Sequence, residues 1–191
     1  MGYRHYLKLA KIKDIKKVSQ ELIDSIKDSE GWFSRYNLFE KLNFIDLIEL
    51  GKYSDEGFEL SAREHKLRKL KKQINLLIEN CSDEDSDFNI ITQEDFVWLI
   101  EKYKERTVNY WKMLLSDERM ESYDKVYEDV GDKCKYYVED LLHWEKFLIN
   151  TDLDNKWILQ TTWKYEYELF NLLHIYKTID WKNNIVFIVG G

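Results

Sequence analysis

Apolar residues recur every three or four positions over most of the chain, which is the period of an α-helix. The sequence contains no proline that would force a helix to stop. Thr92 and Asp95 stand at the positions of a capping box, where a helix would begin. The pattern therefore predicts about six helices, whose apolar stripes cover residues 15–26, 38–48, 67–77, 96–114, 123–148 and 159–174.

The two ends of the chain have a different pattern. Apolar and polar residues alternate over 3–9, which is typical of a half-buried strand, and 185–189 is a continuous β-branched and aromatic run. A lone pair of strands is only marginally stable, so helices must cover it. We expect a mainly α fold: a helical bundle of about six helices with a small β-sheet formed by the N- and C-terminal strands.

The segment 123–148 has the most regular stripe, with apolar residues at alternating spacings of four and three. Such a seam must be buried against other helices or against a second copy of the chain. The stripes at 96–114 and 163–170 can cover it within one chain, so we favour a monomer over a dimer.

Composition narrows the class of protein. The chain of 191 residues is 44% hydrophobic, 15% aromatic and 34% charged, which fits one globular domain, 1–191. It shows neither an apolar run of about 18 residues nor a signal peptide, so we expect a soluble cytoplasmic protein without a membrane partner. Cys81 and Cys134 lie far apart and are expected to be buried thiols.

A basic face is predicted on the third helix. Its members are spaced as on one side of a helix, and they are His65, Arg68, Lys69 and Lys72. This face could contact phosphate groups. The net charge of −7 and the lack of a nucleic-acid motif make nucleic acid a disfavoured partner, and a solvated face is the favoured interpretation.

The acidic segment 83–94 fits several rules of a calcium-binding EF-hand loop. The candidate ligands are Asp83, Asp85, Asp87, Asn89 and Glu94. The match fails at Phe88, where the loop needs glycine, and no second loop is present to pair with it. We therefore favour a solvated connection and expect no calcium dependence and no metal.

Signals for catalysis are absent from the sequence. The four histidines show no metal-ligand spacing, and no glycine-rich phosphate loop occurs. His174 falls on an aromatic stripe, where a core histidine is the favoured interpretation. We expect no catalytic residues and no cofactor. The alternative is a small enzyme with a pocket between the terminal sheet and the last helix, which would use His5 together with Tyr or Glu side chains.

Two stretches carry a resemblance to a known group of proteins. The opening Gly2-Tyr3-Arg4-His5-Tyr6 and the C-terminal segments 163–170 and 175–181 resemble uncharacterised bacterial and prophage-associated proteins. The resemblance implies a bacterial or phage context and no particular activity. We expect a non-enzymatic interaction protein that binds a host protein through a charged and aromatic surface; the alternatives are the small enzyme above and a regulatory protein that contacts nucleic acid.

Overall fold

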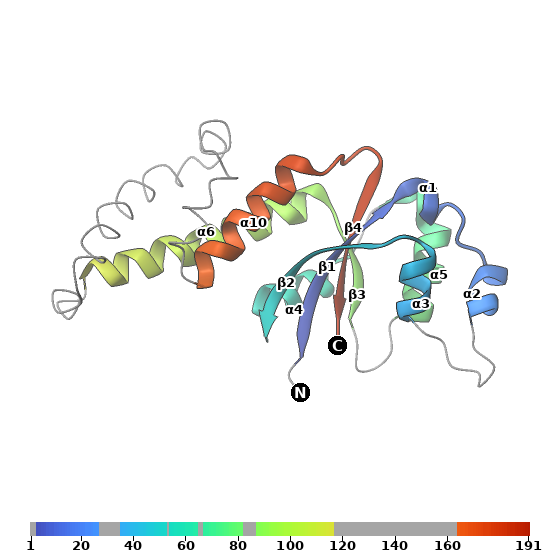
Figure 1. Cartoon of the computed structure of the whole chain (residues 1–191), viewed down its shortest axis with the longest axis horizontal. Helices are drawn as coiled ribbons and strands as arrows, with labels where there is room; N and C mark the ends of the chain where they lie inside the picture. The colour runs from blue at the N-terminus through green and yellow to red at the C-terminus, as the bar shows by residue number, and fades with distance from the viewer. Residues whose placement is uncertain (1–2, 27–34, 53, 65–66, 82–86, 117–163) are drawn as a thin grey trace. The chain divides into compact units, whose positions relative to one another are not determined.

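The computed structural model describes residues 3–26, 35–52, 54–64, 67–81, 87–116 and 164–191. They form α-helices, one short 3-10 helix and a four-stranded sheet (Figure 1). In chain order the elements are β1 (Arg4–Lys11), α1 (Ile12–Ile15), α2 (Gln20–Ile26), α3 (Arg35–Lys41), β2 (Ile45–Lys52), α4 (Asp55–Ser61), η1 (Arg68–Leu70), α5 (Lys71–Cys81), β3 (Phe88–Ile91), α6 (Gln93–Ser116), α10 (Lys164–Thr178) and β4 (Asn184–Gly190).

The chain divides into two compact units. The first comprises Met1–Phe96 and Ile179–Gly191, and the second comprises Val97–Thr178. The whole sheet belongs to the first unit, while most of α6 and all of α10 belong to the second. The single domain expected from the sequence stays a prediction, and the site described below lies within the first unit.

The sheet is antiparallel and has the strand order β2-β1-β4-β3. Its central pair joins β1 to β4, with Leu7 opposite Ile188 and Lys11 opposite Asn184. The terminal strands predicted from the pattern therefore do pair. They are flanked by β2 and β3, which the sequence pattern did not predict.

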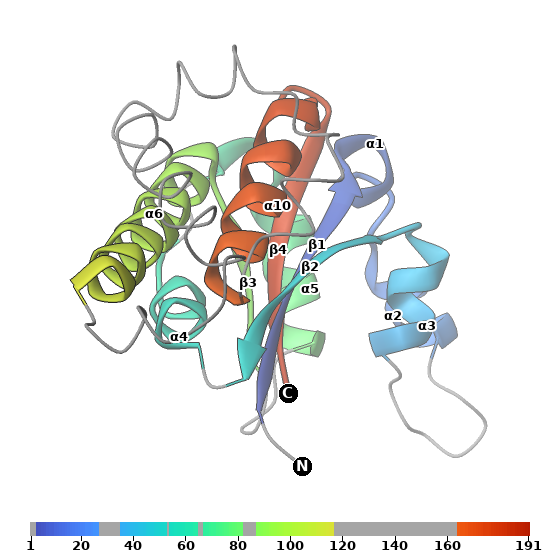
Figure 2. The ribbon, with the colours of Figure 1, turned by 60° about the vertical axis from the view of Figure 1, so that its left-hand side comes forward.

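The two faces of the sheet have different partners. Ala10, Phe88 and Phe187 belong to a buried cluster with side chains of α2, α3 and α5. Figure 2 shows α3 and α4 on opposite sides of the sheet. On the α4 side, Gly57 has no side chain, and this leaves room for the completely buried ring of His5.

Stacked phenylalanine rings tie distant parts of the chain together on the α3 side. The ring of Phe39 stacks on that of Phe44 at a centroid distance of 4.7 Å, and the ring of Phe88 stacks on that of Phe187 at 5.1 Å. Phe44 and Phe187 complete the link at 5.2 Å. Each such pair contributes about 0.5–1.5 kcal/mol beyond its buried area.

The helix expected over 38–48 is wrong in its second half, because α3 ends early. Asn43 takes the left-handed backbone conformation, with φ of 54°. The Phe44 N–H then donates to the Phe39 carbonyl at 2.8 Å, and the Asn43 N–H donates to the Glu40 carbonyl at 3.0 Å. This is a Schellman C-cap. The residues after it form β2.

The expected mainly α fold is also wrong. The described residues form a mixed α/β structure with a four-stranded antiparallel sheet, because two segments assigned to a helix and to a loop are strands. One is β2, and the other is β3, whose four residues are all buried. A short apolar run of this length does not reveal its secondary structure by its period.

The helix expected over 15–26 is interrupted, because α1 ends at Ile15 and α2 begins at Gln20, but two other predicted helices are confirmed. Helix α5 ends at Cys81, just before the acidic segment, and buries Ile74 and Leu77. The capping box at the start of α6 is present, since the Asp95 N–H donates to Thr92 Oγ1 at 3.1 Å and the Thr92 N–H donates to Asp95 Oδ2 at 2.9 Å. The heptad-like segment 123–148 and Cys134 lie outside the described residues. Among the helices that the structure describes, none combines the length and apolar character needed to cross a membrane.

Candidate functional site: a cation-lined cavity

The first unit contains a cavity of about 630 Å³ at the edge of the sheet where β3 ends and β4 begins. Ligand pockets usually have volumes of about 300–1,000 Å³, so this one has room for a small molecule. Its apolar wall is made by Ile12, Leu67, Leu70, Ile91, Ile185 and Val186, and its polar wall by Lys16, Arg68, Lys69, Thr92, Gln93, Trp181, Lys182 and Asn184. We call it the cation-lined cavity.

Positive charge gathers around this cavity from separate parts of the chain. Lys16 follows α1, Arg68 and Lys69 lie on η1, and Lys182 belongs to the turn before β4. All four side chains are exposed, and within the described residues none of them forms an ion pair with a carboxylate. The lining contains no Asp or Glu. Like charges held close together favour the binding of an anion between them.

The nearest acidic group of the turn already has polar partners of its own. The carboxylate of Asp180 accepts hydrogen bonds from the Asn183 side chain at 2.7 Å and from the Lys182 backbone N–H at 3.1 Å. These hydrogen bonds, of which that from Asn183 has the largest effect, hold the pKa of Asp180 below its usual range. Asp180 shapes the turn that carries Lys182, but its side chain does not line the cavity.

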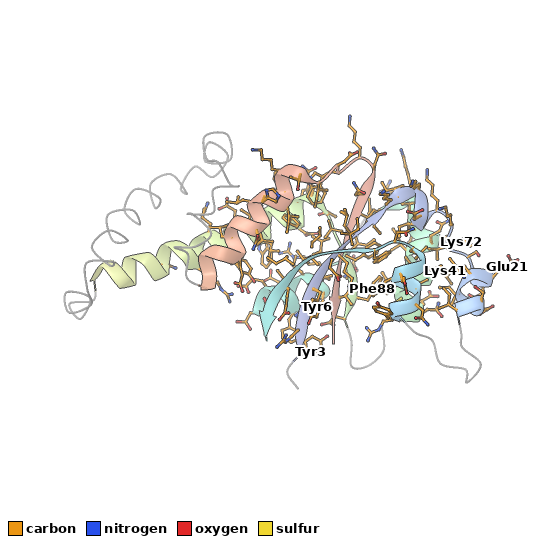
Figure 3. All side chains as sticks on the ribbon, in the orientation of Figure 1. Tyr3, Tyr6, Glu21, Lys41, Lys72 and Phe88 are labelled. Atoms are coloured by element: carbon orange, nitrogen blue, oxygen red, sulfur yellow. The ribbon has the colours of Figure 1, made fainter. Side chains whose placement is uncertain are left out.

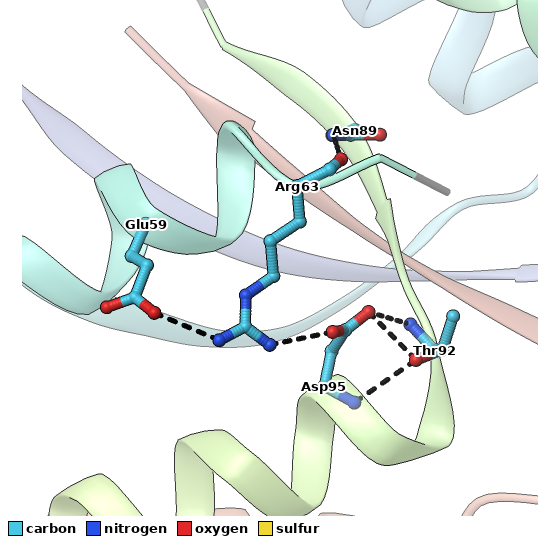
Figure 4. A network of polar contacts seen from close by, with 5 residues as sticks. All are labelled: Glu59, Arg63, Asn89, Thr92 and Asp95. Atoms are coloured by element: carbon cyan, nitrogen blue, oxygen red, sulfur yellow. Dashed lines mark hydrogen bonds and ion pairs between the residues drawn. The ribbon is translucent and has the colours of Figure 1, made fainter. Parts of the chain in front are cut away.

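The start of α6 forms another part of the wall, through Thr92 and Gln93. Figure 4 shows the polar network that fixes it. Arg63 donates to Asp95 Oδ1 at 2.8 Å and to Glu59 at 3.0 Å, which joins the end of α4 to the capping box. Asn89 adds a hydrogen bond to the Ser61 carbonyl at 2.9 Å and another to the Arg63 carbonyl.

This network keeps the Asp95 carboxylate ionised and hydrogen-bonded to Thr92 and Arg63. Burial raises the pKa of Asp95, but hydrogen bonds from Thr92 and Arg63 outweigh that effect, and the pKa lies below its usual range. The negative charge of Asp95 is thus paired with Arg63 rather than left to oppose an anion in the cavity. The N-terminal end of a long helix carries a partial positive charge, which adds to that of the side chains.

Trp181 is the aromatic residue of the lining. Its ring meets that of Phe96 edge to face, with a centroid distance of 5.5 Å and an interplanar angle of 71°. Phe96 is completely buried in the first turns of α6, so it gives Trp181 a firm support.

Only some residues of the predicted basic face line this cavity. Arg68 and Lys69 line it, whereas Lys72 is exposed on α5 (Figure 3) and does not belong to the lining. His65 lies outside the described residues. Sequence reasoning missed Lys16 and Lys182, because only the pairing of β1 with β4 brings the segments that carry them together.

The residues of the EF-hand candidate have separate environments. Asp83 and Asp85 lie outside the described residues, Asn89 is committed to the backbone carbonyls beyond α4, and Glu94 is exposed in the first turn of α6. The Asp87 carboxylate accepts a hydrogen bond from the Tyr3 hydroxyl. In the part of the chain that the structure describes, no three His, Cys, Asp or Glu side chains are grouped to hold a metal.

A second polar cluster lies at the opposite end of the central strands. His5 Nε2 is 3.0 Å from Asp87 Oδ2, and the Tyr3 hydroxyl donates to the same oxygen at 2.7 Å. Burial and this hydrogen bond to Asp87 raise the pKa of Tyr3 to about 12. His5 is completely buried and packs against Gly57, so its ring is not accessible to a substrate, and its contact with Asp87 joins the start of β1 to the segment before β3.

Two further expectations concern single residues. His174, expected in the core, is exposed on α10. Cys81 is buried as expected, and burial raises the pKa of its thiol to about 12.

Comparison of the chain with protein-family models, with curated proteins and with solved structures gave no match.

Proposed function

We propose that this chain is a non-enzymatic binding protein whose first unit takes a small anionic ligand in the cation-lined cavity. The observation that carries the proposal is the lining itself: Lys16, Arg68, Lys69 and Lys182 surround a space of about 630 Å³ with no carboxylate among them. Phosphate and carboxylate groups are the anions that Lys and Arg side chains bind in proteins.

The chemistry of the lining supports binding rather than catalysis. It contains no His, Cys, Ser, Asp or Glu side chain, which are the usual nucleophiles and general bases. The Thr92 hydroxyl is already engaged with Asp95 in the capping box. His5, the histidine of the enzyme alternative, is completely buried at the other end of the strands and does not line the cavity.

The test is titration calorimetry of the full chain with inorganic tripolyphosphate at low salt. Replacing both Arg68 and Lys69 with Gln should weaken binding about tenfold, because each exposed ion pair is worth up to about 1 kcal/mol. Lys72→Gln is the matched control, since Lys72 is a nearby exposed cation outside the lining, and it should leave the affinity unchanged. Equal losses in the two variants, or no binding by the unmodified chain, would overturn the proposal.

Binding of a host protein, the role expected from the sequence, has weaker support. The large hydrophobic side chains that are exposed in the described residues lie on separate elements: Tyr36 on α3, Ile45 on β2, Phe58 on α4 and Leu67 before η1. They offer no aromatic patch for a partner. A cytoplasmic location and a bacterial or phage origin belong to the same proposal and are supported by the sequence alone.

A further inference from the structure

The cation-lined cavity combines two kinds of surface that suit one class of ligand. Trp181 contributes a flat aromatic ring whose orientation is supported by Phe96 at 5.5 Å. Lys182, the next residue, is one of the four cations of the lining. A ligand that uses both must carry a planar ring and negative charge within the length of one small molecule.

The polar groups of the lining suit the edge of a nucleobase. The Asn184 side chain donates one N–H to the Asp180 carbonyl at 2.8 Å, which fixes the amide. Within the described residues no donor contacts its Oδ1. A carbonyl oxygen of this kind accepts from the amino group of a base, as Asn does in base recognition.

The amount of charge indicates more than one phosphate. A phosphate monoester carries a charge of about −1.5 to −2 at neutral pH. The lining supplies four cations and no carboxylate, so a single phosphate would leave a positive excess. A chain of two or three phosphates balances this positive charge. It can also reach cations that come from η1, from the residue after α1 and from the turn before β4.

We propose that the ligand of the cation-lined cavity is a nucleotide with at least two phosphates, whose base packs on Trp181 and whose phosphates are held by Lys16, Arg68, Lys69 and Lys182. This inference rests on the proposed function of the cavity as an anion site. A free nucleotide fits better than a nucleic-acid strand because the chain has a net charge of −7, which opposes binding along a phosphate backbone.

The experiment compares ligands on the full, unmodified chain. Titration calorimetry is run with ATP, GTP, CTP and UTP, with inorganic tripolyphosphate, and with a single-stranded oligonucleotide of mixed sequence. Stacking of one base on an aromatic side chain is worth roughly 5- to 150-fold in affinity. The best of the four nucleotides should therefore bind at least fivefold more tightly than tripolyphosphate.

Substitution of Trp181 then tests whether this residue causes the tighter binding of nucleotides. Trp181→Leu should remove most of the nucleotide preference and leave the affinity for tripolyphosphate unchanged, while Trp181→Phe should retain part of it. Trp98→Leu is the matched control, because Trp98 is a half-buried tryptophan outside the lining. If Trp181→Leu does not fold, the nucleotide inference is still tested by Trp181→Phe and by the ligand comparison on the unmodified chain.

The outcomes separate the two proposals. If all four nucleotides bind no better than tripolyphosphate, the nucleotide inference is overturned and the anion site stands. If no anion binds, both fail. If the oligonucleotide binds more tightly than every nucleotide, the ligand is a nucleic acid and the inference is again overturned.

Discussion

Gly57→Ala probes the contact between α4 and the sheet. A Cβ at this position would lie 2.3 Å from His5 Nδ1, 2.5 Å from His5 Cγ and 2.9 Å from His5 Cβ. These atoms are at the root of the imidazole ring, and the ring is completely buried with its Nε2 3.0 Å from Asp87. The ring cannot move aside without losing that hydrogen bond, so α4 or the strand must shift.

The size of the effect follows from two opposed contributions. Overpacking a well-filled core costs about 1–3 kcal/mol, and three contacts below 3.0 Å place this change at the upper end. Alanine is favoured over glycine within a helix by about 1 kcal/mol. The expected net result is a fall of about 2 kcal/mol in the free energy of unfolding.

The assay is urea denaturation of four chains: the unmodified protein, Gly57→Ala, His5→Gly and the double variant. His5→Gly removes all three of the atoms that would clash, including Cβ. In that background Gly57→Ala should be neutral or should stabilise the protein by up to about 1 kcal/mol, because only the helix preference remains. The effect of the same substitution thus changes sign between the two backgrounds.

Two results would refute this reasoning. An equal loss of stability in both backgrounds would mean that the methyl group is rejected by something other than His5. A Gly57→Ala variant as stable as the unmodified chain would mean that α4 does not pack this closely on β1.

Three further changes test other parts of the fold by denaturation. Asn43→Ala should cost about 1 kcal/mol, because alanine tolerates the left-handed conformation poorly, whereas Asn43→Gly should be neutral or stabilising; equal effects would contradict the C-cap. Thr92→Ala should cost about 0.5–2 kcal/mol through loss of the N-cap, and Thr92→Ser should restore most of it. Burial raises the pKa of Asp87, but hydrogen bonds from Tyr3, His5 and Ser61 outweigh it, so the folded-state pKa lies below the ordinary value of 3.8. The stability that Asp87 contributes is therefore complete well above pH 4 and is lost as the pH falls through the folded-state pKa. Asp87→Asn should make the free energy of unfolding less dependent on pH below about 5. An unchanged pH profile would show that the carboxylate is not linked to folding.

Local signals in the sequence predicted the elements that depend on local physics. The Thr92 and Asp95 capping box and the apolar stripe of α5 were sufficient to place those helices. The same reasoning failed at β2, because Leu38, Leu42 and Ile45 happen to fit a helical stripe. The backbone reversal at Asn43 breaks that stripe, and asparagine after the last helical turn was the signal that could have revealed it.

The candidate site was less predictable than the fold. Arg68 and Lys69 stood out as basic residues, but a solvated helix face was the simpler interpretation of them. Their significance depends on Lys16 and Lys182, which lie near opposite ends of the sequence. No local pattern connects such positions, since the pairing of β1 with β4 alone decides that they meet.

The strand order also determines when this protein can fold. Leu7 pairs with Ile188, so the central pair of the sheet joins the earliest and latest strands of the described chain. During synthesis β1 can form its ladder with β2, but its other edge has no native partner until β4 has left the ribosome. Contacts so distant along the chain slow folding and leave strand edges open to aggregation in the meantime. We therefore expect the sheet to be completed only after translation of β4, and truncated nascent chains to depend on chaperones.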